Sequence, residues 1–333
     1  MKAVFNMMSE MTHMILTDYL TQRDDLMARW AKQLGVNHAV IRLPEDGAFD
    51  PSDLSHWKSY CHRFEALGLH PVVVEPMPVS IYEPIKCGAP DADEAIERAK
   101  AVVRCMGAMR ISTLCVNFMA HIGWHRTRSD YPLRGGALGT AFSMADFAPK
   151  DNFSITEEQL WLNLERFLRE ILPVCEESDV RLALHPDDPP VPKLGNVSRI
   201  LTSLDAIDRA VHIVESDYMG VTLCQGCYAA MGEDVCAAIR HFARQDKLFF
   251  VHFRDVSGTR EDFHECFHDD GMTDMARAVR TYQAWGYRGP IRVDHVPTMA
   301  GERADVPGYA NMGRLYAIGY LKGLLEASGY AFE

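Results

Sequence analysis

Short apolar runs of strand length alternate along the chain with longer stretches whose apolar residues recur at helical spacing. The runs predict strands at 3–7, 38–43, 70–76, 111–118, 180–185, 219–224, 247–252 and 290–294. The longer stretches predict helices near 23–34, 53–67, 91–106, 156–177, 232–244, 272–285 and 309–328. Glycines, or the capping-box pair Thr156 and Gln159, mark several helix ends. Strand and helix are therefore predicted to alternate along nearly the whole chain.

This alternation is typical of an α/β protein with a (β/α)8 TIM barrel, because each helix returns the chain to begin the next parallel strand. An open doubly wound sheet is the alternative. The sequence has no G-x-G-x-x-G motif after a strand and no phosphate-binding loop, which disfavours the nucleotide-binding form of that fold. No linker or internal repeat divides the chain, so we expect a single barrel domain over residues 1–333.

A long segment follows the fourth predicted strand, at 119–155. Its apolar residues show neither strand nor helix spacing, and it is rich in aromatic residues, arginine and glycine. It exceeds the usual length of a loop in a compact domain. We expect an irregular insertion that closes over a site as a lid, with an oligomer contact or a solvated loop as the alternatives.

Composition narrows the class of protein. Of 333 residues, 47% are hydrophobic, and 46 acidic residues outnumber 34 basic ones to give a net charge of −12. This balance disfavours nucleic acid and anionic membranes as partners, and no apolar run is long enough for a membrane span. The first segment lacks a secretory cleavage pattern, and nine cysteines show no disulfide spacing, so we expect a cytoplasmic protein.

Four metal-binding residue types stand at the carboxyl ends of four successive predicted strands: His185, Cys224, His252 and Asp294. In a parallel barrel these ends meet around one mouth, so the four side chains are predicted to bind one divalent cation. Taken singly, each has a plainer interpretation as a core or cap residue. Cys224 and Cys227 also form a C-x-x-C motif, but a redox pair of this kind belongs to a smaller fold, and a thiolate zinc site needs a second such pair, which the sequence lacks. Cys227 is therefore expected to pack in the core or to lie behind the metal ligands.

The order of several motifs over about residues 70–325 resembles the mannonate dehydratase family: VNFMAHIGWHRTRSD, LALHPDDPP, LCQG, VHFRDV, FHDDGMTDM and RVDHVPTMAGE. The resemblance implies a xylose-isomerase-like TIM barrel that dehydrates D-mannonate to 2-keto-3-deoxy-D-gluconate. It implies a divalent metal, first manganese, with Fe²⁺, Mg²⁺ or Zn²⁺ as alternatives, held by the four residues above. It also implicates His295 and Tyr309 in proton transfer.

Such a dehydration removes the C2 proton and the C3 hydroxyl, so it needs one base and one acid. We favour Tyr309 as the base and His295 as the acid, although the sequence does not separate the two roles. Predicted substrate contacts are Asn117, His125, Arg126 and Arg254. For Arg254, a salt bridge to Asp255 or Asp269 is the structural alternative.

Other functions remain open at this point. They are dehydration of another aldonic acid, sugar isomerisation or epimerisation on the same fold, and a binding module with a structural metal. The expected partner is a small sugar acid, and we expect a homo-oligomer, a dimer or larger.

Overall fold

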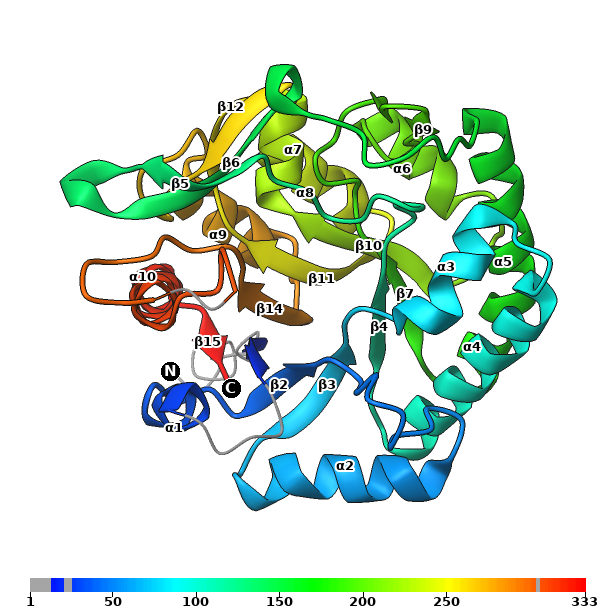
Figure 1. Ribbon diagram of the computed structural model, residues 1–333. Helices are drawn as coiled ribbons and strands as arrows, with labels where there is room; N and C mark the ends of the chain where they lie inside the picture. Colours follow the sequence, from blue (N-terminus) through cyan, green and yellow to red (C-terminus); the bar gives the residue numbers. More distant parts are fainter. Residues whose placement is uncertain (1–12, 21–25, 304–305) are drawn as a thin grey trace.

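The computed structural model describes residues 13–20, 26–303 and 306–333. Eight parallel strands form a barrel, seen end-on in Figure 1. The barrel closes where β14 pairs with β1. In order around the barrel they are β1 (His13–Leu20), β2 (His38–Ile41), β3 (His70–Val74), β4 (Thr113–Val116), β7 (Arg181–Leu184), β10 (Met219–Cys224), β11 (Leu248–Phe253) and β14 (Pro290–Val293). A short strand, β15 (Ala331–Phe332), pairs with the first two residues of β1, just before those that pair with β14. The predicted TIM barrel is confirmed.

Helices surround the barrel on its outside (Figure 1), with their apolar faces turned inward. They are α1 (Leu26–Gln33), α2 (Leu54–Ala66), α3 (Val79–Cys87), α4 (Ala92–Ala108), α5 (Glu157–Glu177), α6 (Leu204–Val211), α7 (Gln225–Met231), α8 (Val235–Ala243), α9 (Met275–Ala284) and α10 (Asn311–Ala327). Thr156 and Gln159 form the predicted capping box at the start of α5. The short helices α3, α6 and α7 were not predicted.

Two apolar layers hold the barrel together. The larger lies between the strands and the helices, and its residues contact one another from β1 to α10. The smaller fills the barrel interior with side chains from neighbouring strands, among them Val40, Val73, Ala183 and Phe250. This packing of the interior leaves the carboxyl ends of the strands as the place for a binding site.

The first barrel strand differs from the prediction. The predicted strand at 3–7 lies outside the described residues, and β1 takes the first place in the barrel instead. Its sequence, HMILTDYL, contains two polar residues that the structure buries. Thr17 donates a hydrogen bond to the carbonyl of Ile291 at 2.9 Å, and Asp18 pairs with Arg314 at 2.6 Å. These distant partners satisfy the polar groups, and a local pattern does not reveal them.

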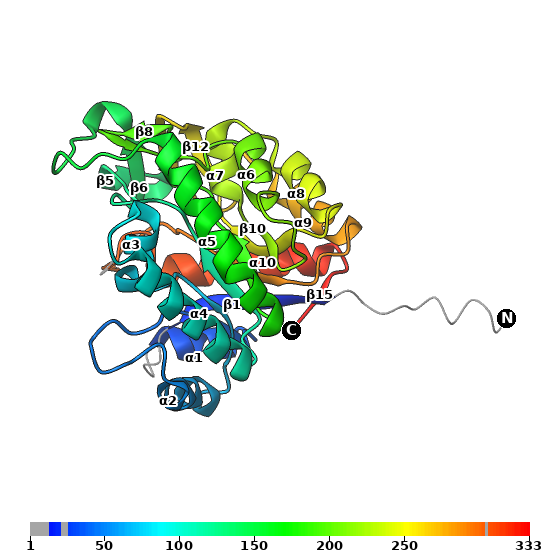
Figure 2. The ribbon, with the colours of Figure 1, turned by 90° about the vertical axis from the view of Figure 1, so that its right-hand side faces the viewer.

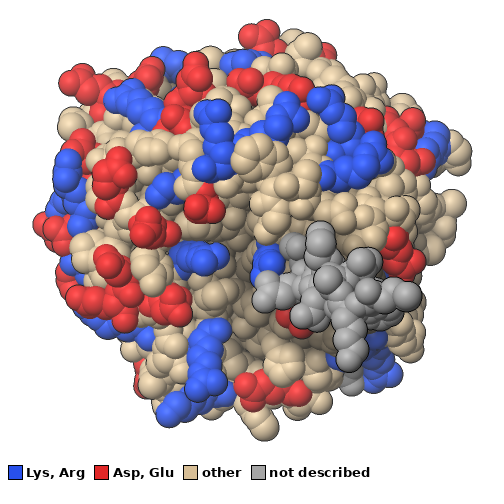
Figure 3. Space-filling view, turned by 180° about the vertical axis from the view of Figure 1, so that it is seen from behind, with Lys and Arg blue, Asp and Glu red and all other residues tan. Residues whose placement is uncertain are grey.

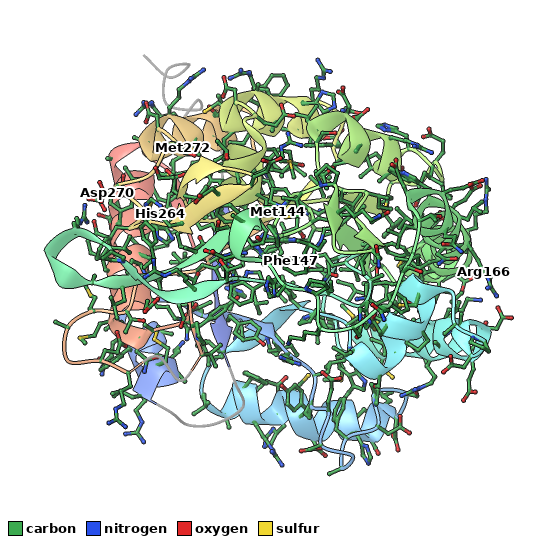
Figure 4. The ribbon with its side chains drawn as sticks, turned by 45° about the horizontal axis from the view of Figure 1, so that its top comes forward. Met144, Phe147, Arg166, His264, Asp270 and Met272 are labelled. Atoms are coloured by element: carbon green, nitrogen blue, oxygen red, sulfur yellow. The ribbon has the colours of Figure 1, made fainter. Side chains whose placement is uncertain are left out.

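The insertion at 119–155 is more regular than predicted. Its middle forms a hairpin of β5 (Arg128–Pro132) and β6 (Leu138–Ser143). This hairpin joins a second hairpin, β12 (Val256–Thr259) and β13 (Asp262–Glu265), in a four-stranded sheet. Figure 2 shows β5, β6 and β12 together at one end of the molecule, and Figure 4 shows His264 and Met144 beside them. The prediction of an irregular segment was wrong because one neighbour of β6 in this sheet, β13, lies far along the chain: Phe142 pairs with Phe263, 121 residues later (263 − 142 = 121).

The charges seen in Figure 3 are mixed, with acidic and basic side chains interspersed over that face. Within the described residues, no helix is long and apolar enough to cross a membrane.

Candidate metal centre and active site

A cavity of about 480 Å³ lies at the carboxyl ends of the barrel strands. Six of the ten predicted site residues line it: Asn117, His185, His252, Asp294, His295 and Tyr309. Each of the first five stands at or just beyond the end of a barrel strand. The fold therefore brings together residues that lie far apart in the sequence, as the predicted topology requires.

The four predicted metal ligands lie together in one corner beside this cavity, at the ends of the neighbouring strands β7, β10, β11 and β14. Three of them line the cavity, and Cys224 does not. The Nε2 atom of His185 lies 3.2 Å from Nδ1 of His252, which lies 3.5 Å from Oδ2 of Asp294. The donor atoms of Cys224, His252 and Asp294 are all within 4.8 Å of one another. This spacing suits a single ion held between the four side chains.

The surroundings favour the anionic forms of two of these donors. Burial alone would raise the pKa of Asp294, but Arg292 and the neighbouring histidines hold it well below its ordinary value. Burial would also raise the pKa of the Cys224 thiol, but a hydrogen bond with Cys227 and the charge of Arg254 hold it low. A carboxylate and a thiolate together carry two negative charges, which match a divalent cation.

Glu75, which the sequence analysis missed, contacts His252 of this corner. One of its oxygens lies 3.1 Å from Nε2 of His252, and the other lies 3.0 Å from Nε of Arg292. Burial would raise the pKa of Glu75, but Arg292 and His252 lower it to about 2. A carboxylate on the far nitrogen fixes the ring so that Nδ1 of His252 faces the other donors. Glu75 also follows a strand, so the same signal could have found it.

Behind the cavity wall lies a second group of charged side chains, the arginine–carboxylate cluster of Arg126, Arg254, Asp188 and Glu265. Arg254 pairs with Asp188 at 2.8 Å and with Glu265 at 2.7 Å. Arg126 pairs with the same two carboxylates. Both carboxylates are buried, and both arginine side chains are at most 3% exposed.

Of this cluster, only Asp188 lines the cavity. The salt-bridge partners expected for Arg254, Asp255 and Asp269, are engaged elsewhere. Asp255 accepts hydrogen bonds from Thr273, and Asp269 pairs with Arg134. The geometry therefore joins Arg126 and Arg254 to buried carboxylates, not to the open space of the cavity.

His295 and Tyr309 stand beside the metal corner. The Tyr309 hydroxyl donates to Oδ1 of Asp294 at 3.1 Å, and Nε2 of His295 lies 3.7 Å from the same oxygen. Burial and the charge of Asp294 raise the pKa of Tyr309 above its ordinary value. Because β14 ends at Val293, strand alternation no longer applies at Asp294 and His295, and both can face the cavity.

The Nδ1 atom of His295 meets the arginine–carboxylate cluster. It is in close contact with Nη1 of Arg254 and lies 3.1 Å from Oε1 of Glu265. On the other side, the indole of Trp124 lies 5.0 Å from the imidazole ring between centroids. The insertion thus contributes one aromatic wall to the cavity.

The two remaining predicted contacts, His125 and Asn117, line different cavities. His125 lines a neighbouring pocket of about 260 Å³ beneath the insertion and packs edge-on against Phe147, whose position Figure 4 labels. Asn117 lines the main cavity, and its side-chain oxygen accepts a hydrogen bond from the backbone of Met119. Of these two residues, Asn117 alone lines the main cavity.

A barrel with buried metal-binding donors at the carboxyl ends of its strands places the chain among the xylose-isomerase-like TIM barrels. A xylose isomerase domain protein from Planctomyces limnophilus matches it with a TM-score of 0.60 at 12% identity, over 96% of this chain and 99% of that one. This likeness shows the fold alone.

The family follows from closer relatives. The family model for D-mannonate dehydratase (UxuA) matches residues 12–154 and 150–332. The mannonate dehydratase of Streptococcus pneumoniae (strain 70585) is 32% identical over 324 residues, covering 88% of this chain and 87% of the relative. The crystal structure of mannonate dehydratase from Streptococcus suis serotype 2 matches with a TM-score of 0.86 at 30% identity, over 95% and 94% of the two chains. The chain belongs to the mannonate dehydratase family of hydro-lyases.

Proposed function

We propose that this protein is a divalent-metal-dependent hydro-lyase that converts D-mannonate to 2-keto-3-deoxy-D-gluconate and water. The observation that carries the proposal is the convergence of His185, Cys224, His252 and Asp294 at one corner of an open cavity. Two anionic and two imidazole donors fit a divalent cation, and we propose manganese first, with iron, magnesium and zinc as alternatives. When bound, the ion supplies Lewis-acid stabilisation for the negative charge that develops next to the substrate carboxylate.

The chain's own residues would carry the two proton transfers. The base removes the proton from C2, the C3–O bond breaks, and the acid protonates the departing hydroxide to give water. The resulting enol becomes the 2-keto product by moving its hydroxyl proton to C3. His295 and Tyr309 flank the cavity with their ring centroids 5.4 Å apart, close enough for both to reach one substrate.

The contact between Arg254 and His295 supports His295 as the acid. A guanidinium group only donates hydrogen bonds, so Nδ1 of His295 accepts from Arg254 and the ring proton sits on Nε2. The oxygen of Glu265 nearby already accepts from Arg254. This leaves an N–H on Nε2, the nitrogen on the side of Asp294, ready to protonate a leaving group, and leaves Tyr309 as the base.

The roles of the other predicted residues are revised accordingly. We propose Asn117 as a contact for a sugar hydroxyl, because it lines the cavity. Arg126 and Arg254 are proposed as positioning residues that act through Glu265 and His295. A substrate contact by His125 stays a prediction.

We further propose that residues 1–333 form one domain and that the insertion at 119–155 covers the site, which the place of Trp124 in the cavity wall supports. A cytoplasmic location and a homo-oligomer also stay predictions.

The test is an assay of the purified, manganese-loaded protein with D-mannonate, following formation of the 2-keto-3-deoxy acid. Turnover that disappears with a chelator and returns with manganese would support the proposal. If metal is bound and no product forms, the named reaction is wrong. A panel of other aldonic acids and of ketoses would then separate a different dehydratase from an isomerase or epimerase.

A further inference from the structure

A second thiol adjoins the metal corner, and the dehydration does not use it. Cys227 lies in the first turn of α7, immediately after the strand end that carries Cys224, and is fully buried. The donor atoms of His185, Cys224 and Cys227 lie within 4.8 Å of one another. Nδ1 of His185 is hydrogen-bonded to the carbonyl of Pro186 at 2.6 Å, so Nε2 is the nitrogen left for an ion.

Cys224 therefore belongs to two sets of donor residues. The first set contains Cys224, His252 and Asp294, and the second contains His185, Cys224 and Cys227. Two members of the first set, His252 and Asp294, line the cavity, whereas only His185 of the second set does. An ion in the second set would be further from the cavity than an ion in the first.

The two sets differ in chemistry. A carboxylate suits a hard ion such as Mn²⁺ or Mg²⁺, and paired thiolates suit a soft ion such as Zn²⁺ or Cd²⁺. The charge of a second thiolate also has a partner, because Nη2 of Arg254 donates to the sulfur of Cys227 at 3.2 Å. Arg254 would remain in place as a counter-charge when Cys227 binds an ion.

We propose that Cys227 is a second thiolate ligand, which with His185 and Cys224 gives thiophilic ions a sulfur-rich site beside the manganese site. The inference rests on the proposed metal centre and goes beyond it. A soft ion held there binds tightly, is displaced from Asp294 and the cavity, and supports little dehydration. Cadmium, and zinc when it occupies this sulfur-rich set, would therefore inhibit the manganese-loaded protein.

The experiment is a titration of the reduced, metal-free full-length protein with Cd²⁺, following the ultraviolet charge-transfer absorption of cadmium–thiolate bonds. This absorption grows with the number of thiolates on the ion. The variants are Cys227→Ser, Cys224→Ser and, as the matched control, Cys236→Ser. Cys236 is also a buried free cysteine, but it lies in α8 and belongs to none of the donor groups.

We expect the wild type and Cys236→Ser to show two thiolates per cadmium ion, and Cys227→Ser and Cys224→Ser to show one each. Zinc affinity should fall at least about tenfold in Cys227→Ser, by analogy with the loss of other metal-site groups. Manganese affinity, measured by the electron paramagnetic resonance of free Mn²⁺, should stay the same in that variant. A Cys227→Ala variant and the thermal melting curve of each metal-free protein check that a lost ligand and not a lost fold is responsible.

Full cadmium–thiolate absorption and unchanged zinc affinity in both Cys227 variants would overturn the inference. If Cys224→Ser loses absorption in that case, the proposed metal centre still stands. If Cys224→Ser also keeps the wild-type spectrum, the metal centre itself is wrong. The two failures are therefore distinguishable.

Discussion

The metal corner and the arginine–carboxylate cluster lie side by side, and both are built from buried charged residues. In the cluster, two arginines face two carboxylates, so the charges satisfy one another. In the metal corner, the donors of Cys224, His252 and Asp294 face one another across a shared point. Like-charged or acceptor-rich groups gathered in this way need a cation, whereas a balanced cluster needs none. The difference separates the proposed metal site from a neighbouring cluster whose charges are already balanced.

The largest effect is expected from breaking the metal corner. His185→Asn removes a nitrogen of the proposed metal site that lines the cavity. We expect turnover to fall by about a thousandfold or more because the developing charge loses its stabilisation. Turnover with D-mannonate and the manganese content of the purified variant measure this. The unfolding free energy of the metal-free variant should remain near that of the wild type. Wild-type turnover would show that His185 is not a ligand.

Breaking the arginine–carboxylate cluster should have the opposite effect: it should lower the stability of the fold and change metal binding little. Glu265→Gln leaves Arg126 and Arg254 with one buried carboxylate fewer, and such losses cost about 3–5 kcal/mol. Urea unfolding of the metal-free protein measures the loss. Manganese affinity in the folded fraction should change little, because Glu265 lies behind the cavity wall. If Glu265→Gln loses metal but not stability, the assignment of metal binding to the corner and of stability to the cluster is wrong.

Proton transfer depends on the contact between the two regions, through His295. We expect Tyr309→Phe and His295→Asn each to lower turnover by about 10²–10⁴-fold. In deuterated water, His295→Asn should still exchange the C2 proton of D-mannonate, since the base remains, whereas Tyr309→Phe should not. Nuclear magnetic resonance of recovered substrate measures the exchange. The reverse pattern would assign His295 as the base.

Acid should weaken the metal-free fold through carboxylates whose pKa the fold lowers. The pKa of Glu75 is lowered to about 2 from an ordinary value of 4.5. Its ionised form is therefore favoured by folding, and this stability is present above about pH 4.5 and lost as the pH falls towards 2. The free energy of unfolding, measured with urea at several pH values in this range, should fall less steeply with falling pH in Glu75→Gln than in the wild type. Equal slopes would mean that other carboxylates account for the loss.

The sequence predicted that the four donor residues lie close together, but it did not predict the cluster, for a physical reason. Each of the four donors ends an apolar strand, and the topology of a parallel barrel alone brings strand ends together. The cluster instead depends on which partners face one another. Glu265 lies on β13, which pairs with the inserted hairpin, and no local pattern places it against Arg254.

The same limit explains the other errors. The polar residues of β1 find partners near the far end of the chain, at Ile291 and Arg314. The hairpin of the insertion pairs with residues that follow β11. The spacing of hydrophobic residues and the composition describe one segment by itself. Elements that form because they pair with a distant part of the chain are therefore hard to recognise from their own sequence.

The smallest effect tests whether burial, and not the mere pairing of arginine with a carboxylate, makes the cluster important. Arg134 of the insertion pairs with Asp269 at 2.6 Å, but its side chain is 43% exposed. Water and salt screen such a pair, so Arg134→Ala should cost only about 0–1 kcal/mol in urea unfolding. Raising the salt concentration should reduce this difference further. A loss as large as that of Glu265→Gln would show that the two kinds of pair are equivalent here and that burial is not the cause.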